Sequence, residues 1–267
     1  VHNDVDRLVY ERHQQLGLLV SERCSDAEFI RRASLDTVGK LPAAERVREF
    51  LASKDAKKRE KYIDELLADP DWADFWAIKW GDLLRPNTRH VGVKPVMLMD
   101  RWIRRSFRSG MPYDEFVREL LTATGSSHEV GPVALLRDKR DPKFLGAYVS
   151  QVFMGVRLDC AQCHHHPNEK WGQEDYYQMA AFFGSLKRKG QGISAPISGE
   201  PEYWWWQAGG TVNHPVTGEV MAPKPPDGPM EKIPPGKDPR AALVDWLLQP
   251  DNPFFARAVV NRIWGEM

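Results

Sequence analysis

The sequence predicts a mainly α-helical protein, with a long irregular segment and a short β-hairpin inserted near residues 187–237. Two observations favour this class. Through the first 185 residues, apolar side chains recur at helical spacing in short stretches separated by Pro, Gly and Asp. From residue 187 to residue 239, Gly and Pro become dense, and only residues 203–206 and 219–221 suit strands. Helices are expected again after Asp238 and Asn252, because each is a cap residue followed by Pro.

The predicted helices of the first half have recognisable start signals. Ser25 and Glu28 have the form of a capping box ahead of an apolar run. Pro42 stands in a first helical turn, where its missing N–H costs no hydrogen bond. Apolar spacing predicts the other helices over residues 5–18, 57–68, 70–84, 95–109, 113–122, 143–158 and 171–183.

Three features of these segments need interpretation. Trp72, Trp76 and Trp80 recur at i, i+4 and i+8, and we interpret them as core packing rather than the wall of a cofactor site. The arginines of residues 95–109 are interpreted as a solvated helix face. Residues 125–141 lack a clear pattern and are expected to form a loop.

Composition excludes several classes of protein. The 37 basic and 37 acidic residues leave no net charge to recruit nucleic acid, and no apolar run approaches a membrane span. Residues 1–251 are expected to form a single helical domain. Residues 252–267 are expected to begin a following module, since the chain starts without Met and stops within a helical pattern, as an excised fragment would.

The strongest motif is Cys160-Ala-Gln-Cys163-His164. Two thiols at this spacing can each add to a vinyl group of one haem, and the adjacent histidine then faces the iron. With three Cys and eight His in the chain, this pattern arises by chance on the order of once in a thousand sequences. The sequence therefore predicts one covalent haem c, with thioether bonds from Cys160 and Cys163 and His164 as the proximal ligand. Cys24 is expected to be a free thiol without a role.

Two other interpretations of the motif are weaker. A redox dithiol of the thioredoxin kind follows a strand, whereas this motif follows a predicted helix. Zinc would take Cys160, Cys163 and one or two of the three consecutive histidines. Structural zinc sites usually need a second ligand pair, and the sequence has no other Cys-x-x-Cys.

The second axial position of the haem is open. His165 and His166 are too close to His164 to reach the opposite face, so His166 and Arg157 are expected to contact a propionate or an iron ligand. His214 is the first candidate for the distal ligand, because its segment is long and irregular enough to fold over the haem. The weaker candidates are Met179, Met221, Met154, Met230, His128 and His90. A vacant iron has comparable weight.

Several segments together carry a family resemblance. They are residues 29–36, 76–85, 111–117, 155–164 and 252–262. With them the chain resembles the cytochrome-associated domain of unknown function that is common in large secreted planctomycete proteins, often between a small cytochrome c domain and a second uncharacterised domain.

The resemblance implies a periplasmic or cell-surface location and a haem c. It also implies roles for His166 and His214, because the His-x-His-Pro of residues 164–167 and the His-Pro of residues 214–215 recur in the family. Asn168 departs from the family pattern, which has Phe there, and this puts the packing beside His166 in doubt. The resemblance supplies no activity.

Three function classes follow. The first is a c-type cytochrome module that passes electrons to a redox partner or to neighbouring domains, rather than a catalyst by itself. The second is a haem enzyme or gas sensor with a vacant distal site. The third is a glycan-binding or zinc-stabilised module, in which residues 203–206 (YWWW) stack on a polysaccharide, although an edge strand covering the haem or the core is the simpler interpretation.

Overall fold

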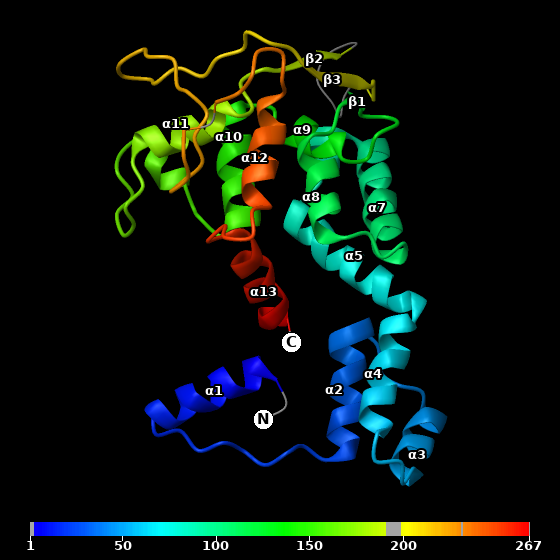
Figure 1. The fold of residues 1–267 in the computed structure, drawn as a ribbon. Coiled ribbons are helices and arrows are strands. Elements are labelled where there is room, and N and C mark those ends of the chain that lie inside the picture. Colours follow the sequence, from blue (N-terminus) through cyan, green and yellow to red (C-terminus); the bar gives the residue numbers. More distant parts are fainter. Residues whose placement is uncertain (1–2, 191–198, 231, 267) are drawn as a thin grey trace. The chain divides into compact units, whose positions relative to one another are not determined.

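The computed structural model describes residues 3–190, 199–230 and 232–266. Its contacts form two compact units, Val1–Trp72 and Ala73–Met267. Helices dominate both units, and one small antiparallel sheet belongs to the second (Figure 1), so the predicted fold class is confirmed. The expected domain boundary at residue 251 stays a prediction. Among the described helices, none has the length and apolar character needed to cross a membrane.

In its described part, the first unit contains α1 (Asp4–Gln15), α2 (Asp26–Val38), α3 (Ala44–Ala52), α4 (Lys58–Ala68) and the first residues of α5 (Pro70–Leu84). The predicted capping box opens α2, where Ser25 and Glu28 bond each other's backbone N–H groups. A small core joins α2, α3 and α4 around Phe50. Inside it, the hydroxyl groups of Ser34 and Tyr62 lie 2.5 Å apart.

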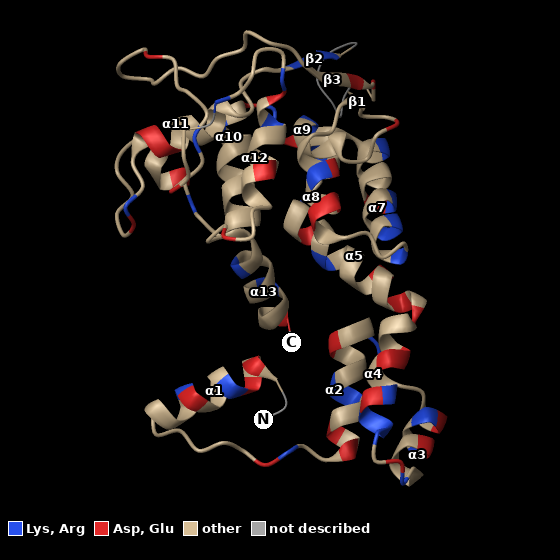
Figure 2. Cartoon of the chain, viewed as in Figure 1, with Lys and Arg blue, Asp and Glu red and all other residues tan. Residues whose placement is uncertain are grey.

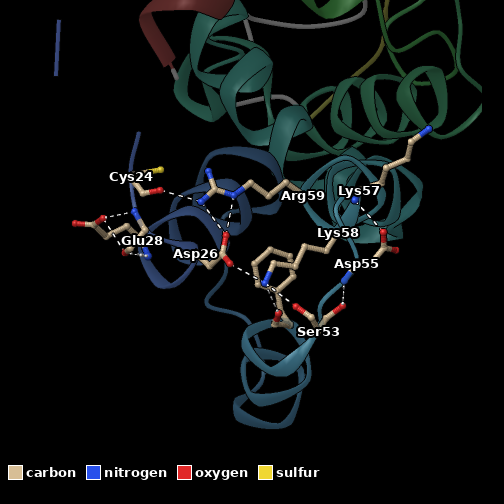
Figure 3. A network of polar contacts seen from close by, with 10 residues as sticks. Cys24, Asp26, Glu28, Ser53, Asp55, Lys57, Lys58 and Arg59 are labelled. Carbon is tan, nitrogen blue, oxygen red and sulfur yellow. Dashed lines mark hydrogen bonds and ion pairs between the residues drawn. The ribbon is translucent and has the colours of Figure 1, made fainter. Parts of the chain in front are cut away.

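A polar network ties the start of α2 to α4 (Figure 3). Asp26 accepts hydrogen bonds from Lys58 at 2.6 Å and from Arg59 at 2.8 Å, and Arg59 also donates to the backbone carbonyl of Cys24. The bonds from Lys58 and Arg59 lower the pKa of the Asp26 carboxyl. Figure 2 shows both acidic and basic residues on α2 and α4.

The second unit is built on the remaining helices. These are α5 (Pro70–Leu84), α6 (Thr88–Val91), α7 (Val93–Arg108), α8 (Tyr113–Leu121), α9 (Val133–Asp138), α10 (Pro142–Val149), a π-helix (Ser150–Met154), a 3-10 turn (Asp159–Gln162), α11 (Gln173–Ala181), α12 (Pro239–Leu247) and α13 (Phe255–Glu266). Trp102 of α7 and Phe116 of α8 stack at 4.4 Å in the core. The arginines of α7 lie outside it, as predicted, and Arg104 pairs with Asp74 and Asp100.

The tryptophan stripe of α5 is core only in part. Trp80 packs edge-on against Phe116, with 5.1 Å between ring centroids. Trp76 is half-buried, whereas Ala73 and Ala77 are fully buried. Ala73 and Ala77 are thus buried more deeply than the tryptophan rings of this helix.

Two expectations from the sequence are wrong, one for β3 and one for residues 125–141. Strands β1 (Gly125–Ser126), β2 (Leu186–Gly190) and β3 (Glu202–Trp206) pair antiparallel in the order β1-β3-β2, so β3 is the central strand and not an edge. Residues 125–141 are not a plain loop either, because they contain β1 and α9. The helix was missed since its residues Val133, Ala134, Leu135 and Leu136 are all buried and therefore lack an amphipathic period.

Candidate functional site

Helix α10 leads the chain into the C-x-x-C-H motif. Asp141 caps the helix by accepting from the backbone N–H of Lys143. Gly146 allows α10 to pack directly on α11, because a Cβ there would lie 3.0 Å from backbone atoms of Ala180 (Figure 1). Gly155, with a φ of 70°, ends the π-helix and reverses the chain. The motif then lies between two helical segments, as predicted.

A short 3-10 turn presents the two thiols. Leu158 and Ala161 are buried and anchor the turn in the core. Cys160 and Cys163 are exposed and free. On this turn the aliphatic side chains of Leu158 and Ala161 are therefore buried, whereas the thiols of Cys160 and Cys163 are exposed.

Helix α11 holds the turn from the other side. The backbone carbonyl of Gln162 accepts a hydrogen bond from Gln173 Nε2 at 3.0 Å and a longer one from Tyr177 Oη at 3.5 Å. Both donors belong to the first half of α11. The backbone between the two cysteines is thus fixed at a peptide group of Gln162.

His164 has a defined arrangement of ring nitrogens. Its Nδ1 atom lies 2.6 Å from the backbone carbonyl oxygen of His165. A carbonyl only accepts, so Nδ1 carries the hydrogen and Nε2 of the neutral ring keeps its lone pair. This is the nitrogen arrangement of a histidine that binds a metal through Nε2.

His166 has the opposite arrangement. Its Nδ1 accepts from the backbone N–H groups of Asn168 and Glu169, at 3.2 and 3.0 Å. The neutral ring therefore carries its hydrogen on Nε2 and presents a donor. Asn168 takes part through its backbone, and its side chain is exposed, so this turn does not need the aromatic residue of the family pattern.

His214 forms a second turn of the same kind. Its Nδ1 accepts from the backbone N–H groups of Val216 and Thr217, both at 3.3 Å. Its ring lies 5.7 Å from that of Tyr177, centroid to centroid, and Tyr177 reaches Gln162. The ring of His214 thus lies beside Tyr177, and in its neutral form it carries its hydrogen on Nε2.

The other predicted residues are distributed differently. Met179 is fully buried in the core of the second unit, and Met221 is half-buried against the same core. Arg157 is exposed. None of the described contacts joins these three side chains to the cysteines or to His164.

A buried hydroxyl lies beside the motif. Tyr176 is fully buried, and its Oη has no hydrogen-bond partner among the described residues. Burial raises the pKa of this hydroxyl, and the neighbouring Tyr177, Asp159, Asp141 and Cys163 raise it further. Sequence reasoning placed Tyr176 in a helix but did not single it out.

A cavity of about 470 Å³ borders the turn that carries the thiols. Its wall includes Asp159, the residue before Cys160, together with Phe144 and Tyr148 of α10. His90 of α6 lines it as well, and His90 Nδ1 lies 3.0 Å from an oxygen of the buried Asp138. Because 48 residues separate His90 from Asp138, no sequence motif marks the pair.

Within residues 3–190, 199–230 and 232–266, no three His, Cys, Asp or Glu side chains converge in a manner suited to a metal ion.

Fold and site together define a mainly helical protein with an exposed C-x-x-C-H turn. The model of the PSCyt2 family, described as a protein of unknown function (DUF1549), matches residues 4–188. The chain belongs to this family. Searches of curated proteins and of solved structures gave no match.

Proposed function

We propose that the chain is a c-type cytochrome module that holds one haem through thioether bonds from Cys160 and Cys163 and transfers electrons outside the cytoplasm. The proposal rests on the exposure of the two thiols and on the hydrogen-bonding arrangement of the His164 ring. Two free thiols are exposed on one turn, and the next residue, His164, has a free Nε2 lone pair. A pair of cysteines with a purely structural role would not need exposed thiols, and a surface histidine would not need a free Nε2 lone pair.

The donor set of the motif fits a covalent haem, because two exposed thiols and the adjacent imidazole of His164 would hold it. The cavity beside the turn is lined mostly by charged side chains, together with Phe144 and Tyr148, so its lining does not supply the apolar surroundings of a haem.

When bound, haem c supplies a one-electron couple whose potential depends on its axial ligands and burial. The chain's own part is to hold and orient. Leu158 and Ala161 fix the turn in the core, and the carbonyl of His165 fixes the ring of His164. A redox partner protein, or neighbouring domains of the same polypeptide, would donate and accept the electrons.

The location follows from the proposed chemistry. Thiols destined for haem attachment must stay reduced until ligation, and the maturation of c-type cytochromes takes place outside the cytoplasm. We therefore assign the protein to the periplasm or the cell surface, in agreement with the family resemblance. Export with a signal peptide and recovery in the periplasmic fraction with bound haem would test this assignment.

Haem attachment is tested by a pyridine haemochrome spectrum of chain produced with a c-type maturation system. The wild type should show one haem c per chain that resists acid-acetone extraction. The double variant Cys160→Ala/Cys163→Ala should show none. Cys24→Ala is the matched control and should retain a full complement, because Cys24 lies in the first unit.

Two results would overturn the proposal. One is wild-type chain that leaves a working maturation system without haem, above all if it contains zinc. The other is a Cys160→Ala/Cys163→Ala variant that keeps covalent haem. A haem enzyme or gas sensor is the alternative within the haem class, and carbon monoxide binding by the reduced wild type would favour it.

One observation on β3 favours a second candidate function, glycan binding. Tyr203 and Trp205 are 47% and 36% exposed, while Trp204 between them is buried, so two rings share one open face of the sheet. Affinity electrophoresis in polysaccharide gels should show retardation that Tyr203→Ala/Trp205→Ala abolishes. Trp264→Ala, which removes an exposed ring from α13, is the control. Equal mobility of all three proteins with and without polysaccharide would exclude this function.

A further inference from the structure

We propose that a cavity between α7 and the segment that follows α8 binds an acidic sugar, that is, a polyhydroxylated molecule with one carboxylate. Arg101 and Arg105 hold the carboxylate, and Glu119 and Glu129 accept hydrogen bonds from the hydroxyl groups. The inference goes beyond the proposed function and does not depend on haem, because no residue that lines this cavity belongs to the C-x-x-C-H motif.

The arginines of α7 form two pairs with different surroundings. Arg104 and Arg108 both bond a carboxylate oxygen of Asp74, at 2.8 and 2.7 Å. Arg101 and Arg105 are exposed, and their guanidinium groups have no partner among the residues that the structure describes. Since they stand at positions i and i+4 of one helix, they share a face. The helix therefore presents one ion-paired face and a second face with two available cations.

Both available cations line a cavity of about 690 Å³. Its remaining wall comes partly from α7 and α8 and partly from residues 122–124 and 129–132. This volume is typical of sites for small molecules. Leu98, Val130 and Pro132 add apolar surface, which suits the C–H face of a sugar ring.

The two sides of the cavity are fixed relative to each other by backbone contacts. A Cβ on Gly131 would lie 2.5 Å from the backbone oxygen of Leu98, so residue 131 packs directly on α7. The fully buried Arg240 donates to the backbone carbonyls of Leu121 and Ala123, at 3.2 and 2.8 Å. A site held in this way needs little ordering when a ligand binds.

Acceptors in the same cavity decide which kind of anion it suits. Glu119 Oε2 accepts from Trp102 Nε1 at 2.8 Å, which leaves its second oxygen for a ligand. The carboxylate of Glu129 has no partner among the described residues. Thr122 Oγ1 already donates to the backbone carbonyl of Arg118 at 2.7 Å, so its remaining capacity is to accept.

These acceptors favour a sugar acid over other anions. A polyanion would be repelled by the carboxylates of Glu119 and Glu129. An amino acid would offer one ammonium group to acceptors that come from separate positions of the chain. A sugar acid offers one carboxylate for the two arginines and several hydroxyl donors for the acceptors, so it matches both sets of groups.

Isothermal titration calorimetry tests the proposal with three hexuronates as probes: D-glucuronate, D-galacturonate and D-mannuronate. At least one of them should bind wild-type chain saturably. D-Glucose and acetate should bind at least about tenfold more weakly, because each lacks one of the two sets of hydrogen bonds. Arg101→Gln/Arg105→Gln should weaken hexuronate binding by at least about tenfold.

Arg104→Gln/Arg108→Gln is the matched control. It removes the same charge from the same helix, but its arginines pair with Asp74 and do not line the cavity. Hexuronate affinity should therefore equal that of wild type. All four substituted side chains lie at the surface or partly exposed, so both double variants should keep the circular dichroism spectrum of wild type.

Three results would overturn the inference. They are wild-type chain that binds none of the three hexuronates, equal hexuronate affinity of the two double variants, and binding of acetate or glycine as tight as that of the hexuronates. None of these results bears on haem attachment. Wild-type chain without haem would refute the proposed function and leave the sugar-acid site standing, so the two proposals fail separately.

Discussion

His90 and Asp138 form a histidine–carboxylate pair with 3.0 Å between Nδ1 and the nearer carboxylate oxygen. The carboxylate is buried and the imidazole is exposed. A buried carboxylate needs a strong donor, and the ring N–H supplies it alongside Lys139. The pair thus joins a buried carboxylate to an exposed ring that lines the same cavity as Asp159.

Replacing Asp138 by Asn should destabilise the protein by about 1–3 kcal/mol, because the neutral amide replaces a buried carboxylate that bonds both His90 and Lys139. Asp141→Asn is the control, since it removes a neighbouring charge while Asn still caps α10. Urea unfolding followed by circular dichroism measures both variants. Equal urea midpoints of Asp138→Asn and wild type would contradict a stabilising role for the pair.

Gly146→Ala should destabilise the protein by about 1–3 kcal/mol, because a Cβ would overpack the contact between α10 and α11. Its nearest neighbours are backbone atoms of Ala180 at 3.0 Å, which cannot turn aside as a side chain does. Gly81→Ala in α5 is the matched control: nothing lies within 4 Å of its Cβ position, and helix propensity predicts a gain of about 0.5–1 kcal/mol. Urea unfolding followed by circular dichroism measures both. A neutral Gly146→Ala would contradict the packing described.

Two tyrosine hydroxyls should respond in opposite directions to replacement by Phe. Tyr62→Phe removes the bond to Ser34 and leaves a buried hydroxyl unpaired, at a cost of about 1–3 kcal/mol. Tyr176→Phe removes a buried hydroxyl that has no described partner, so haem-free protein should gain up to about 1 kcal/mol. Thermal unfolding of the two variants gives the comparison. Clear destabilisation by Tyr176→Phe would show that this hydroxyl is bonded in the haem-free chain.

Acid should weaken the first unit through Asp26. Its folded-state pKa is lowered by the bonds from Lys58 and Arg59, so its stabilising contribution is complete above the unfolded pKa of about 3.9. The contribution is lost as the pH falls through the lower, folded-state value. Asp26→Asn should therefore be less stable than wild type at pH 7, and the difference should shrink below pH of about 4. Urea midpoints at several pH values measure it.

Asp64→Asn provides the control for this pH dependence. Asp64 is an exposed residue of α4 outside the network of Figure 3, so its replacement should leave the urea midpoint and its pH profile near those of wild type. A difference between Asp26→Asn and wild type that persists undiminished at pH 3 would contradict the charge-based explanation.

Local signals made the helices predictable. The capping box of Ser25 and Glu28 depends on bonds within four residues, and it forms as expected. Strand β3 shows the limit of such signals. Its partner β1 has only two residues, and Gly125 pairs with Trp204 across a long stretch of chain, so sequence pattern could not show that β3 is central.

The candidate site also has one part that the sequence could predict and one part that it could not. The C-x-x-C-H turn was predictable because its chemistry lies within five consecutive residues. The contact of Tyr177 with His214 and the pair of His90 with Asp138 are tertiary contacts. Sequence reasoning named both histidines as candidates, but the states of their rings depend on those contacts and on backbone groups in turns.

The most direct test of haem attachment is the intact mass of the denatured chain after maturation in the periplasm of a host that also matures a known c-type cytochrome. The expected result is a mass increase of one haem per chain, retained under denaturing conditions and mapped to the peptide that contains Cys160 and Cys163. An unmodified mass, in cells where the known cytochrome receives its haem, would contradict it.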